Sequence, residues 1–149
     1  MSDWLEHTVQ IEVPVSIDTV WSLWSDLEQM PNWMKWISSV KVSESDPEIS
    51  DWMLASGAFE FKWKSKVIKQ VTNQIIQWES VDGLPNRGAI RFYDRGESGS
   101  IVKLTIGYGL PAILKQVLET LNVGRIVETT LYADMERFRD YAIKHNINQ

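Results

Sequence analysis

The segment from Phe59 to Val67 alternates between two kinds of side chain with a period of two residues. One set is largely apolar (Phe59, Phe61, Trp63, Ser65 and Val67), and the other is charged (Glu60, Lys62, Lys64 and Lys66). Because successive side chains of a strand point to opposite faces of the sheet, this pattern predicts a strand that is buried on one face and solvated on the other. The ring-bearing face must therefore pack against a second layer.

Six further segments have the composition and turn signals of strands. They are residues 7–15, 36–45, 50–56, 72–80, 88–95 and 100–110, and the strand that begins at Phe59 extends to Gln70. Pro14 indicates a sheet edge or the end of a strand. Asp46-Pro47, Gly57, Asp82-Gly83-Leu84-Pro85 and Gly96-Glu97-Ser98-Gly99 are the turn signals that separate the later strands.

Two short helices are expected between the first two strands. Ser16 is placed as an N-cap, and Asp18 lies in the first turn, where a negative charge favours the helix dipole. Pro31 interrupts the pattern, so residues 28–35 are predicted to form a second short helix or a turn set at an angle.

The end of the chain has a helical period. Apolar residues recur at spacings of three and four from Ala112 to about Asn146 and form one stripe, which predicts a single long helix. Gly124 falls in the middle of this helix, where a glycine marks a bend or a close approach.

Seven strands in a meander with one long helix are best packed by curling the sheet around that helix. The expected class is therefore α+β, a curved seven-stranded antiparallel sheet around a long C-terminal helix, with two short helices after the first strand. The sequence has 149 residues, of which 44% are hydrophobic and 23% charged, and no internal repeat or linker. We therefore expect one domain over residues 1–149.

Several classes of function are disfavoured by composition. A net charge of −5 offers little attraction for a phosphate backbone, so nucleic acid is not expected as a partner. The absence of cysteine excludes disulfides, thiolate metal sites and a cysteine nucleophile. His7 and His145 lie near opposite ends of the chain without carboxylates at ligand spacing, so no metal site is expected. No secretory signal or transmembrane run is visible, and a cytoplasmic location is expected.

The inward faces of the predicted strands gather large rings and branched aliphatic side chains. One interpretation is a packed core. The other is that a strongly curved sheet and one helix leave a concavity, which becomes an apolar cavity for a small molecule. Residues 30–37, with two Trp and two Met, allow the same two interpretations, core packing or an adaptable rim or lid.

Several motifs resemble one known family. Residues 13–34 contain a capped helix that carries Trp21 and Trp24, followed by a break and Pro31-Asn32-Trp33-Met34. Further along come Ile76-x-Trp78-x-Ser80, Gly83, Gly88-x-Ile90-x-Phe92 and the long final helix. In this order, over residues 7–145, they resemble the polyketide cyclase/dehydrase and lipid-transport family. The resemblance implies a START-like, helix-grip fold.

The activities of that family range from aromatase/cyclases to lipid-transfer, coenzyme Q-binding and plant hormone-binding proteins, so the fold does not fix the function. Cyclases of the family are thought to use a pocket arginine with hydroxyl or carboxyl groups. The candidates here are Arg87, Arg91, Tyr93, Tyr108 and Glu79. By alternation Arg91, Tyr93 and Glu79 point outward, which leaves Tyr108 as the one weak catalytic candidate.

The leading hypothesis is a non-enzymatic binding or transport protein for a lipid, isoprenoid, quinone or aromatic polyketide, with no cofactor. The proposed ligand contacts are Trp33, Trp36, Phe59, Phe61, Trp63, Trp78, Phe92, Ile106, Tyr108, Leu121 and Met135. Two alternatives stay open, a cyclase or dehydratase that uses the same cavity and a protein-binding module with a filled core. The Lys62, Lys64 and Lys66 row is interpreted as a solvated face, or as a contact for an acidic partner or a membrane surface.

Overall fold

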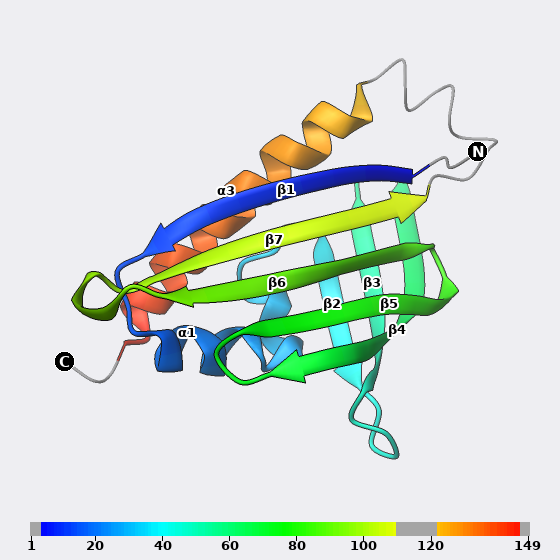
Figure 1. The fold of residues 1–149 in the computed structure, drawn as a ribbon. Helices are drawn as coiled ribbons and strands as arrows, with labels where there is room; N and C mark the ends of the chain where they lie inside the picture. Colours follow the sequence, from blue (N-terminus) through cyan, green and yellow to red (C-terminus); the bar gives the residue numbers. More distant parts are fainter. Residues whose placement is uncertain (1–3, 110–121, 147–149) are drawn as a thin grey trace.

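The computed structural model describes residues 4–109 and 122–146, which form a curved antiparallel sheet with helices on its concave side (Figure 1). The strands are β1 (Trp4–Val13), β2 (Ile37–Val42), β3 (Ile49–Ser56), β4 (Phe59–Val71), β5 (Ile75–Gly83), β6 (Asn86–Asp94) and β7 (Ser100–Gly109). Their order in the sheet is β1-β7-β6-β5-β4-β3-β2. Strands β2 to β7 therefore form a meander, and β1 pairs with β7 along its whole length.

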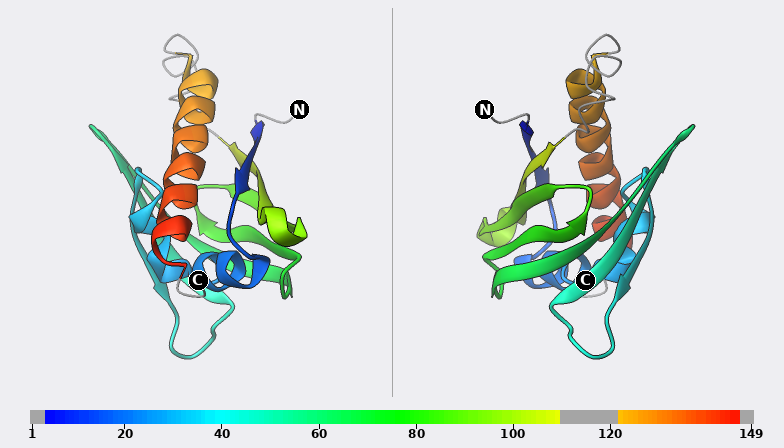
Figure 2. Two further views of the ribbon diagram at one scale, coloured as in Figure 1. Left: turned by 90° about the vertical axis from the view of Figure 1, so that its left-hand side faces the viewer. Right: turned by 90° about the vertical axis from the view of Figure 1, so that its right-hand side faces the viewer.

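The curvature of the sheet has a local cause in the pairing of β4 with β5. The register between β4 and β5 shifts at Lys64/Ser65 and again at Val67/Lys69. An extra residue on one strand of a pair bends that strand and increases its twist. The two ends of the sheet are thereby turned toward each other, and Figure 2 shows helix α3 lying between them.

The two short helices follow β1 as the sequence predicts. Helix α1 spans Ile17–Trp24, and the Ser16 hydroxyl accepts a hydrogen bond from the backbone amide of Thr19. This contact pairs one of the amide groups that a helix leaves without a partner in its first turn. The second helix, η1, is a 3₁₀ helix over Leu27–Asn32 that contains Pro31.

Helix α3 spans Val123–Lys144, and its start differs from the prediction. Asn122 adopts a left-handed conformation with φ of 54°, which a continuous helix cannot accommodate. The predicted helix is therefore wrong at this point, because α3 begins after Asn122 and Gly124 lies in its first turn instead of its middle. Residues 112–121 of the predicted helix lie outside the described residues.

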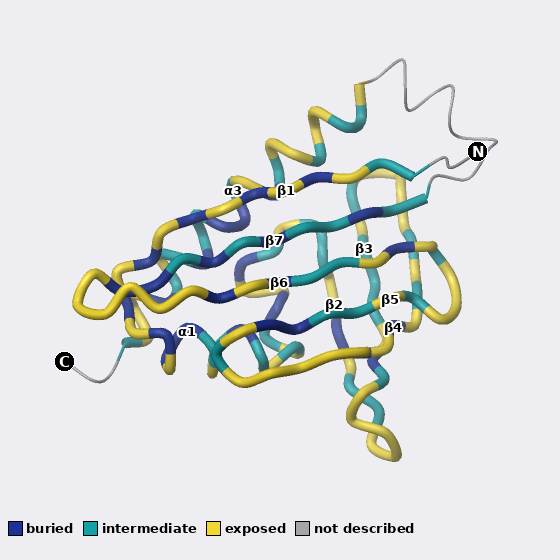
Figure 3. The backbone as a smooth tube through the Cα atoms, in the orientation of Figure 1, coloured by how far each residue is buried: buried dark blue, intermediate teal, exposed yellow. Residues whose placement is uncertain are grey.

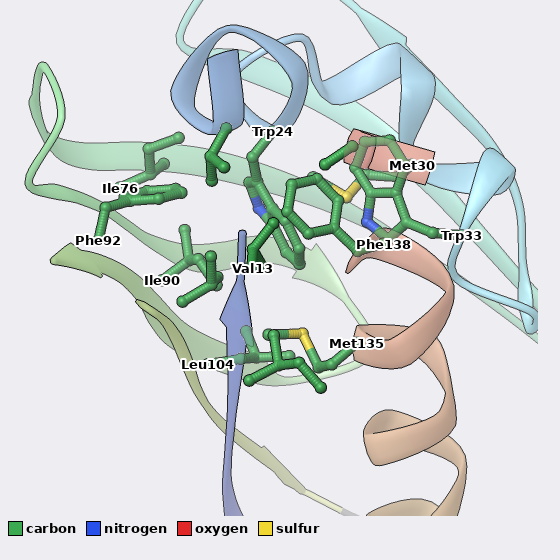
Figure 4. Packing of buried hydrophobic residues seen from close by; sticks show 14 of the residues in the cluster. Val13, Trp24, Met30, Trp33, Ile76, Ile90, Phe92, Leu104, Met135 and Phe138 are labelled. Atoms are coloured by element: carbon green, nitrogen blue, oxygen red, sulfur yellow. The ribbon is translucent and has the colours of Figure 1, made fainter. Parts of the chain in front are cut away.

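The core contains an aromatic cluster where α1, η1 and α3 meet (Figure 4). The ring centroids of Trp24 and Phe138 are 4.8 Å apart, and those of Trp33 and Phe138 are 4.9 Å apart. Leu104 of β7 and Met135 of α3 are buried beside this cluster (Figure 4). The core thus fills the end of the concave face nearest to α1.

Burial alternates along the strands in the way the sequence predicts (Figure 3). In β1, His7, Val9, Ile11 and Val13 are buried, and the residues between them are exposed. Strand β5 begins at Ile75, later than expected, because Asn73 takes a left-handed turn conformation with φ of 64°. The predicted curved sheet around a C-terminal helix is confirmed. No helix in residues 4–109 and 122–146 is long and apolar enough to cross a membrane.

Candidate ligand-binding cavity

A cavity of about 340 Å³ lies between the concave face of the sheet and α3. Its wall comes from strands β2 to β7, from the segment around η1 and from α3, and nearly all of the lining side chains are apolar. The α3 contribution consists of Val123, Ile126, Val127, Thr130, Leu131 and Asp134. A concave, apolar space with a few polar groups is typical of a small-molecule site.

Strand β4 supplies the most regular part of the wall. All five inward residues of the alternating segment line the cavity: Phe59, Phe61, Trp63, Ser65 and Val67. The lysines between them point to solvent, where Lys64 forms an ion pair of 3.3 Å with Asp51. The period of two in the sequence therefore places the rings of β4 toward the cavity.

Trp78 is fixed against the wall by its neighbours. A side chain at Gly88, its partner on β6, would collide with the indole ring, so only glycine leaves room for Trp78 there. The indole Nε1 donates to the side-chain oxygen of Asn86 at 3.2 Å, and the amide nitrogen of Asn86 donates to the Leu84 carbonyl at 2.9 Å. This part of the wall is therefore rigid and its polar groups are paired.

Seven of the side chains expected to contact a ligand line this cavity. They are Trp36, Phe59, Phe61, Trp63, Trp78, Ile106 and Tyr108. Leu121 lies outside the described residues. Trp33, Phe92 and Met135 belong to the packed core, with exposed fractions of 1%, 4% and 0%, and are not among the described residues that form the wall.

There is a physical reason why these three residues lie in the core and not on the cavity wall. Alternation gives the face on which a side chain lies, but not its position along the cavity. Phe92 does point inward, yet it lies toward the end of β6 that α1 covers, and its ring packs against Trp21 at 5.2 Å. These three side chains therefore lie in the core, and their contact with a ligand stays a prediction.

A polar contact at the cavity wall involves His7, for which the sequence predicts no metal-binding role. The Tyr108 hydroxyl lies 3.0 Å from Nε2 of His7, and Nδ1 of His7 lies 3.5 Å from a carboxylate oxygen of Glu128. Burial raises the pKa of the Tyr108 hydroxyl to about 12, so the phenol is neutral at physiological pH. His7 shares the parity of Val9, Ile11 and Val13, and this signal in the sequence indicates that it is buried.

Asp134 is a polar residue of the cavity wall that sequence reasoning missed. It is 3% exposed, accepts a hydrogen bond from the Lys35 amide at 3.1 Å and pairs with Arg137. Burial raises the pKa of its carboxyl above the ordinary value of 3.8, although the Lys35 amide and Arg137 act in the opposite direction. Its spacing of three residues from Leu131 and four from Phe138 is the signal that places it on the buried face of α3.

The other catalytic candidates lie away from the cavity. The outer side of the sheet exposes Arg87, Arg91, Tyr93 and Glu79. Alternation along the strands predicts this position for Arg91, Tyr93 and Glu79. The Arg87 guanidinium lies over the Trp4 ring at 4.4 Å. Within the described residues, no group of three or more His, Asp or Glu side chains could hold a metal ion.

A second depression has a different character. An open groove of about 770 Å³ runs between β1 and α3 and is lined by Thr8, Val9, Gln10, Arg125, Glu128, Thr129, Tyr132, Ala133 and Glu136. Its charged and solvated wall does not suit an apolar ligand. Glu128 belongs to this groove, and Tyr108 belongs to the cavity.

Similar proteins share this fold at low sequence identity. A protein of Thermus thermophilus, TTHA0849, is 20% identical with a TM-score of 0.79 and covers 94% of this chain and 98% of its own. The Zhui aromatase/cyclase from Streptomyces sp. R1128 is 16% identical with a TM-score of 0.73, covering 95% of this chain and 93% of its own. An uncharacterized 17.2 kDa protein from the melC2-rnhH intergenic region of Streptomyces lincolnensis is 19% identical over 132 residues, 88% of this chain and 85% of the relative.

The cavity, the curved sheet and the helix across it are the features of a helix-grip fold. The family described as polyketide cyclase/dehydrase and lipid transport matches residues 13–136, which is most of the sequence. The chain therefore belongs to the polyketide cyclase/dehydrase and lipid-transport family.

Proposed function

We propose that this protein binds or transports a small hydrophobic molecule in the cavity between the sheet and α3. The observation that carries this proposal is the cavity itself, about 340 Å³ in volume and walled almost entirely by apolar side chains. The mixed activities of the family are compatible with it, because lipid transport is part of the family's description. A lipid, isoprenoid, quinone or aromatic polyketide has the required chemistry.

The expected affinity follows from the area that such a ligand buries. Transfer of about a dozen apolar carbons from water contributes roughly 0.8 kcal/mol each. Part of this gain is offset by the loss of translational and rotational freedom. Dissociation constants in the micromolar range or below are therefore expected.

Native mass spectrometry of freshly purified protein, followed by extraction of bound material, tests the proposal. An apolar compound should co-purify with the wild-type protein and be reduced in a Val127→Trp variant, because Val127 lines the cavity and the larger ring takes up part of its volume. Tyr132→Trp is the matched control, since Tyr132 is 49% exposed and lines the outer groove. The proposal fails if no apolar compound co-purifies and Trp fluorescence does not change when lipids, quinones or polyketides are added.

A cyclase or dehydratase is the second candidate, favoured by one observation. Tyr108 brings a hydroxyl group to the apolar wall, and this hydroxyl is hydrogen bonded to His7. A phenol paired with an imidazole can take part in proton transfer during catalysis. A Tyr108→Phe variant distinguishes the two candidates, because it should abolish the turnover of a cyclase and leave the retention of a hydrocarbon by a carrier unchanged.

The third hypothesis, a protein-binding module with a filled core, has less support. It requires a packed interior and an exposed segment around Trp33 and Trp36. Instead, Trp33 is 1% exposed, and Trp36 lines the cavity.

A further inference from the structure

Three polar side chains from three elements connect the apolar cavity to the outer groove. Tyr108 of β7 lines the cavity, and Glu128 of α3 lines the groove with a side chain that is 64% exposed. His7 of β1 lies between them at 8% exposure. Its Nε2 is 3.0 Å from the Tyr108 hydroxyl, and its Nδ1 is 3.5 Å from Glu128. The imidazole of His7 thus contacts one residue of the cavity and one residue of the outer groove.

The chemistry of Glu128 decides which nitrogen of a neutral His7 carries the proton. A carboxylate has no hydrogen to donate and can only accept hydrogen bonds. The nitrogen that faces it is therefore the one that bears the hydrogen, because the other tautomer would direct a lone pair at a negative charge. Nδ1 of His7 is thus the donor, and Nε2 is left with a lone pair toward Tyr108.

This tautomer sets the direction of the bond to Tyr108. A phenol has one hydrogen to donate, and the Nε2 lone pair of His7 receives it. The phenolic oxygen retains its lone pairs, so Tyr108 offers the cavity an acceptor and no donor. Asn86 is the register partner of Tyr108 on β6. Its side-chain amide is engaged elsewhere, because its oxygen accepts a hydrogen bond from Trp78 and its nitrogen donates one to the Leu84 carbonyl.

We propose that Tyr108, oriented by His7 and Glu128, is a recognition site for the hydroxyl group of an apolar ligand, a phenol or an alcohol. The ligand hydroxyl donates to the phenolic oxygen of Tyr108 while its hydrocarbon body fills the cavity. This inference rests on the proposed function and narrows the ligand class, because an ether or a ketone has no hydrogen to donate at this position. The raised pKa of Tyr108 supports it, since the phenol stays protonated and keeps its bond to His7.

Three biphenyls that differ in one substituent test the inference by isothermal titration calorimetry at pH 8. They are para-phenylphenol, which can donate; para-methoxybiphenyl, which can only accept; and para-methylbiphenyl, which can do neither. The phenol should bind about tenfold more tightly than the methyl compound, as one buried hydrogen bond allows. The methoxy compound should bind no more tightly than the methyl compound.

Variants separate recognition from packing. Tyr108→Phe should erase the advantage of the phenol over para-methylbiphenyl. His7→Leu removes the group that accepts the Tyr108 hydrogen. The phenol can then donate this hydrogen to the methoxy oxygen, so the methoxy compound should bind severalfold more tightly than the methyl compound. Tyr132→Phe, at an exposed tyrosine of the same protein, should change none of the three affinities. Thermal unfolding and the affinity for para-methylbiphenyl report whether each variant is folded.

The possible failures are distinguishable. If no biphenyl binds the wild-type protein, this inference fails, whereas the proposed function fails only if co-purification and the ligand panel are negative as well. If the methyl compound binds but the phenol has no advantage, the inference alone is overturned. The inference is also overturned if the phenol still binds more tightly than the methyl compound to Tyr108→Phe, or if the methoxy compound binds the wild-type protein as tightly as the phenol does.

Discussion

The carboxylate of Asp134 accepts a hydrogen bond of 3.1 Å from the backbone amide of Lys35, a residue 99 positions away in the sequence. This bond joins helix α3 to the segment that follows η1, and Asp134 lies on the cavity wall. Arg137 strengthens the connection, because it pairs with Asp134 and its Nε donates to the Trp33 carbonyl at 3.0 Å. Two side chains one turn apart on α3 thus hold one wall of the cavity in place.

Removal of the Asp134 carboxylate should destabilise the protein. Asp134→Ala leaves the Lys35 amide and Arg137 without their carboxylate partner, and the loss of a hydrogen bond to a charged group costs about 2 kcal/mol. We expect a decrease of this size in the free energy of unfolding, measured by urea denaturation. The control is Asp140→Ala, which removes an ion pair with Arg139 from an exposed part of the same helix and should change stability by less than about 0.5 kcal/mol. Equal effects of the two variants would refute the role of this contact.

The charge of Asp134 should make stability depend on pH. Burial raises the pKa of its carboxyl above 3.8, so the folded chain holds a proton over a pH interval in which the unfolded chain has released it. The free energy of unfolding therefore falls as pH rises through that interval. Asp134→Asn keeps an oxygen that accepts from Lys35 but has no such proton.

The measurement is the difference in unfolding free energy between wild type and Asp134→Asn from pH 3 to 7. This difference should favour the wild type most at acid pH and shift toward the variant as pH rises. A shift in the opposite direction would mean that the pair with Arg137 outweighs the burial of the carboxylate.

Much of the fold could be predicted because it depends on local periodicity. The alternation of Phe59, Phe61 and Trp63 fixes the inward face of β4, and the same argument correctly places Arg91 and Glu79 outside. The cap at Ser16 follows from the preference of a hydroxyl for the amides of a first helical turn.

The remainder depends on pairings between distant segments. His7 and Tyr108 are 101 residues apart, and the register of β1 against β7 is needed to bring them close together. The left-handed conformation of Asn122 sets the start of α3. The periodicity of the apolar residues gives no signal for it. A pattern of alternation also carries no information on position along the concave face, so it cannot separate Phe92, which lies in the core, from the rings of the cavity wall.

Trp33 and Trp36 lie three residues apart but should respond in opposite ways to truncation. Trp33 is 1% exposed and packs between Trp24 and Phe138, so Trp33→Ala leaves a large void in the core and should lower the free energy of unfolding by about 4 kcal/mol. Trp36 is partly exposed and lines the cavity, so Trp36→Ala should cost only about 1 kcal/mol.

Ligand affinity should show the reverse order, because Trp36 offers its ring to the cavity and Trp33 does not. We expect Trp36→Ala to weaken the binding of para-methylbiphenyl by about tenfold, the usual loss for one aromatic contact. Trp33→Phe, which keeps most of the packing against Trp24 and Phe138, should bind it as the wild type does. Urea denaturation and calorimetry on the same samples give both quantities. If Trp33→Phe loses affinity and Trp36→Ala does not, the ligand occupies the space beneath α1 rather than the cavity between the sheet and α3.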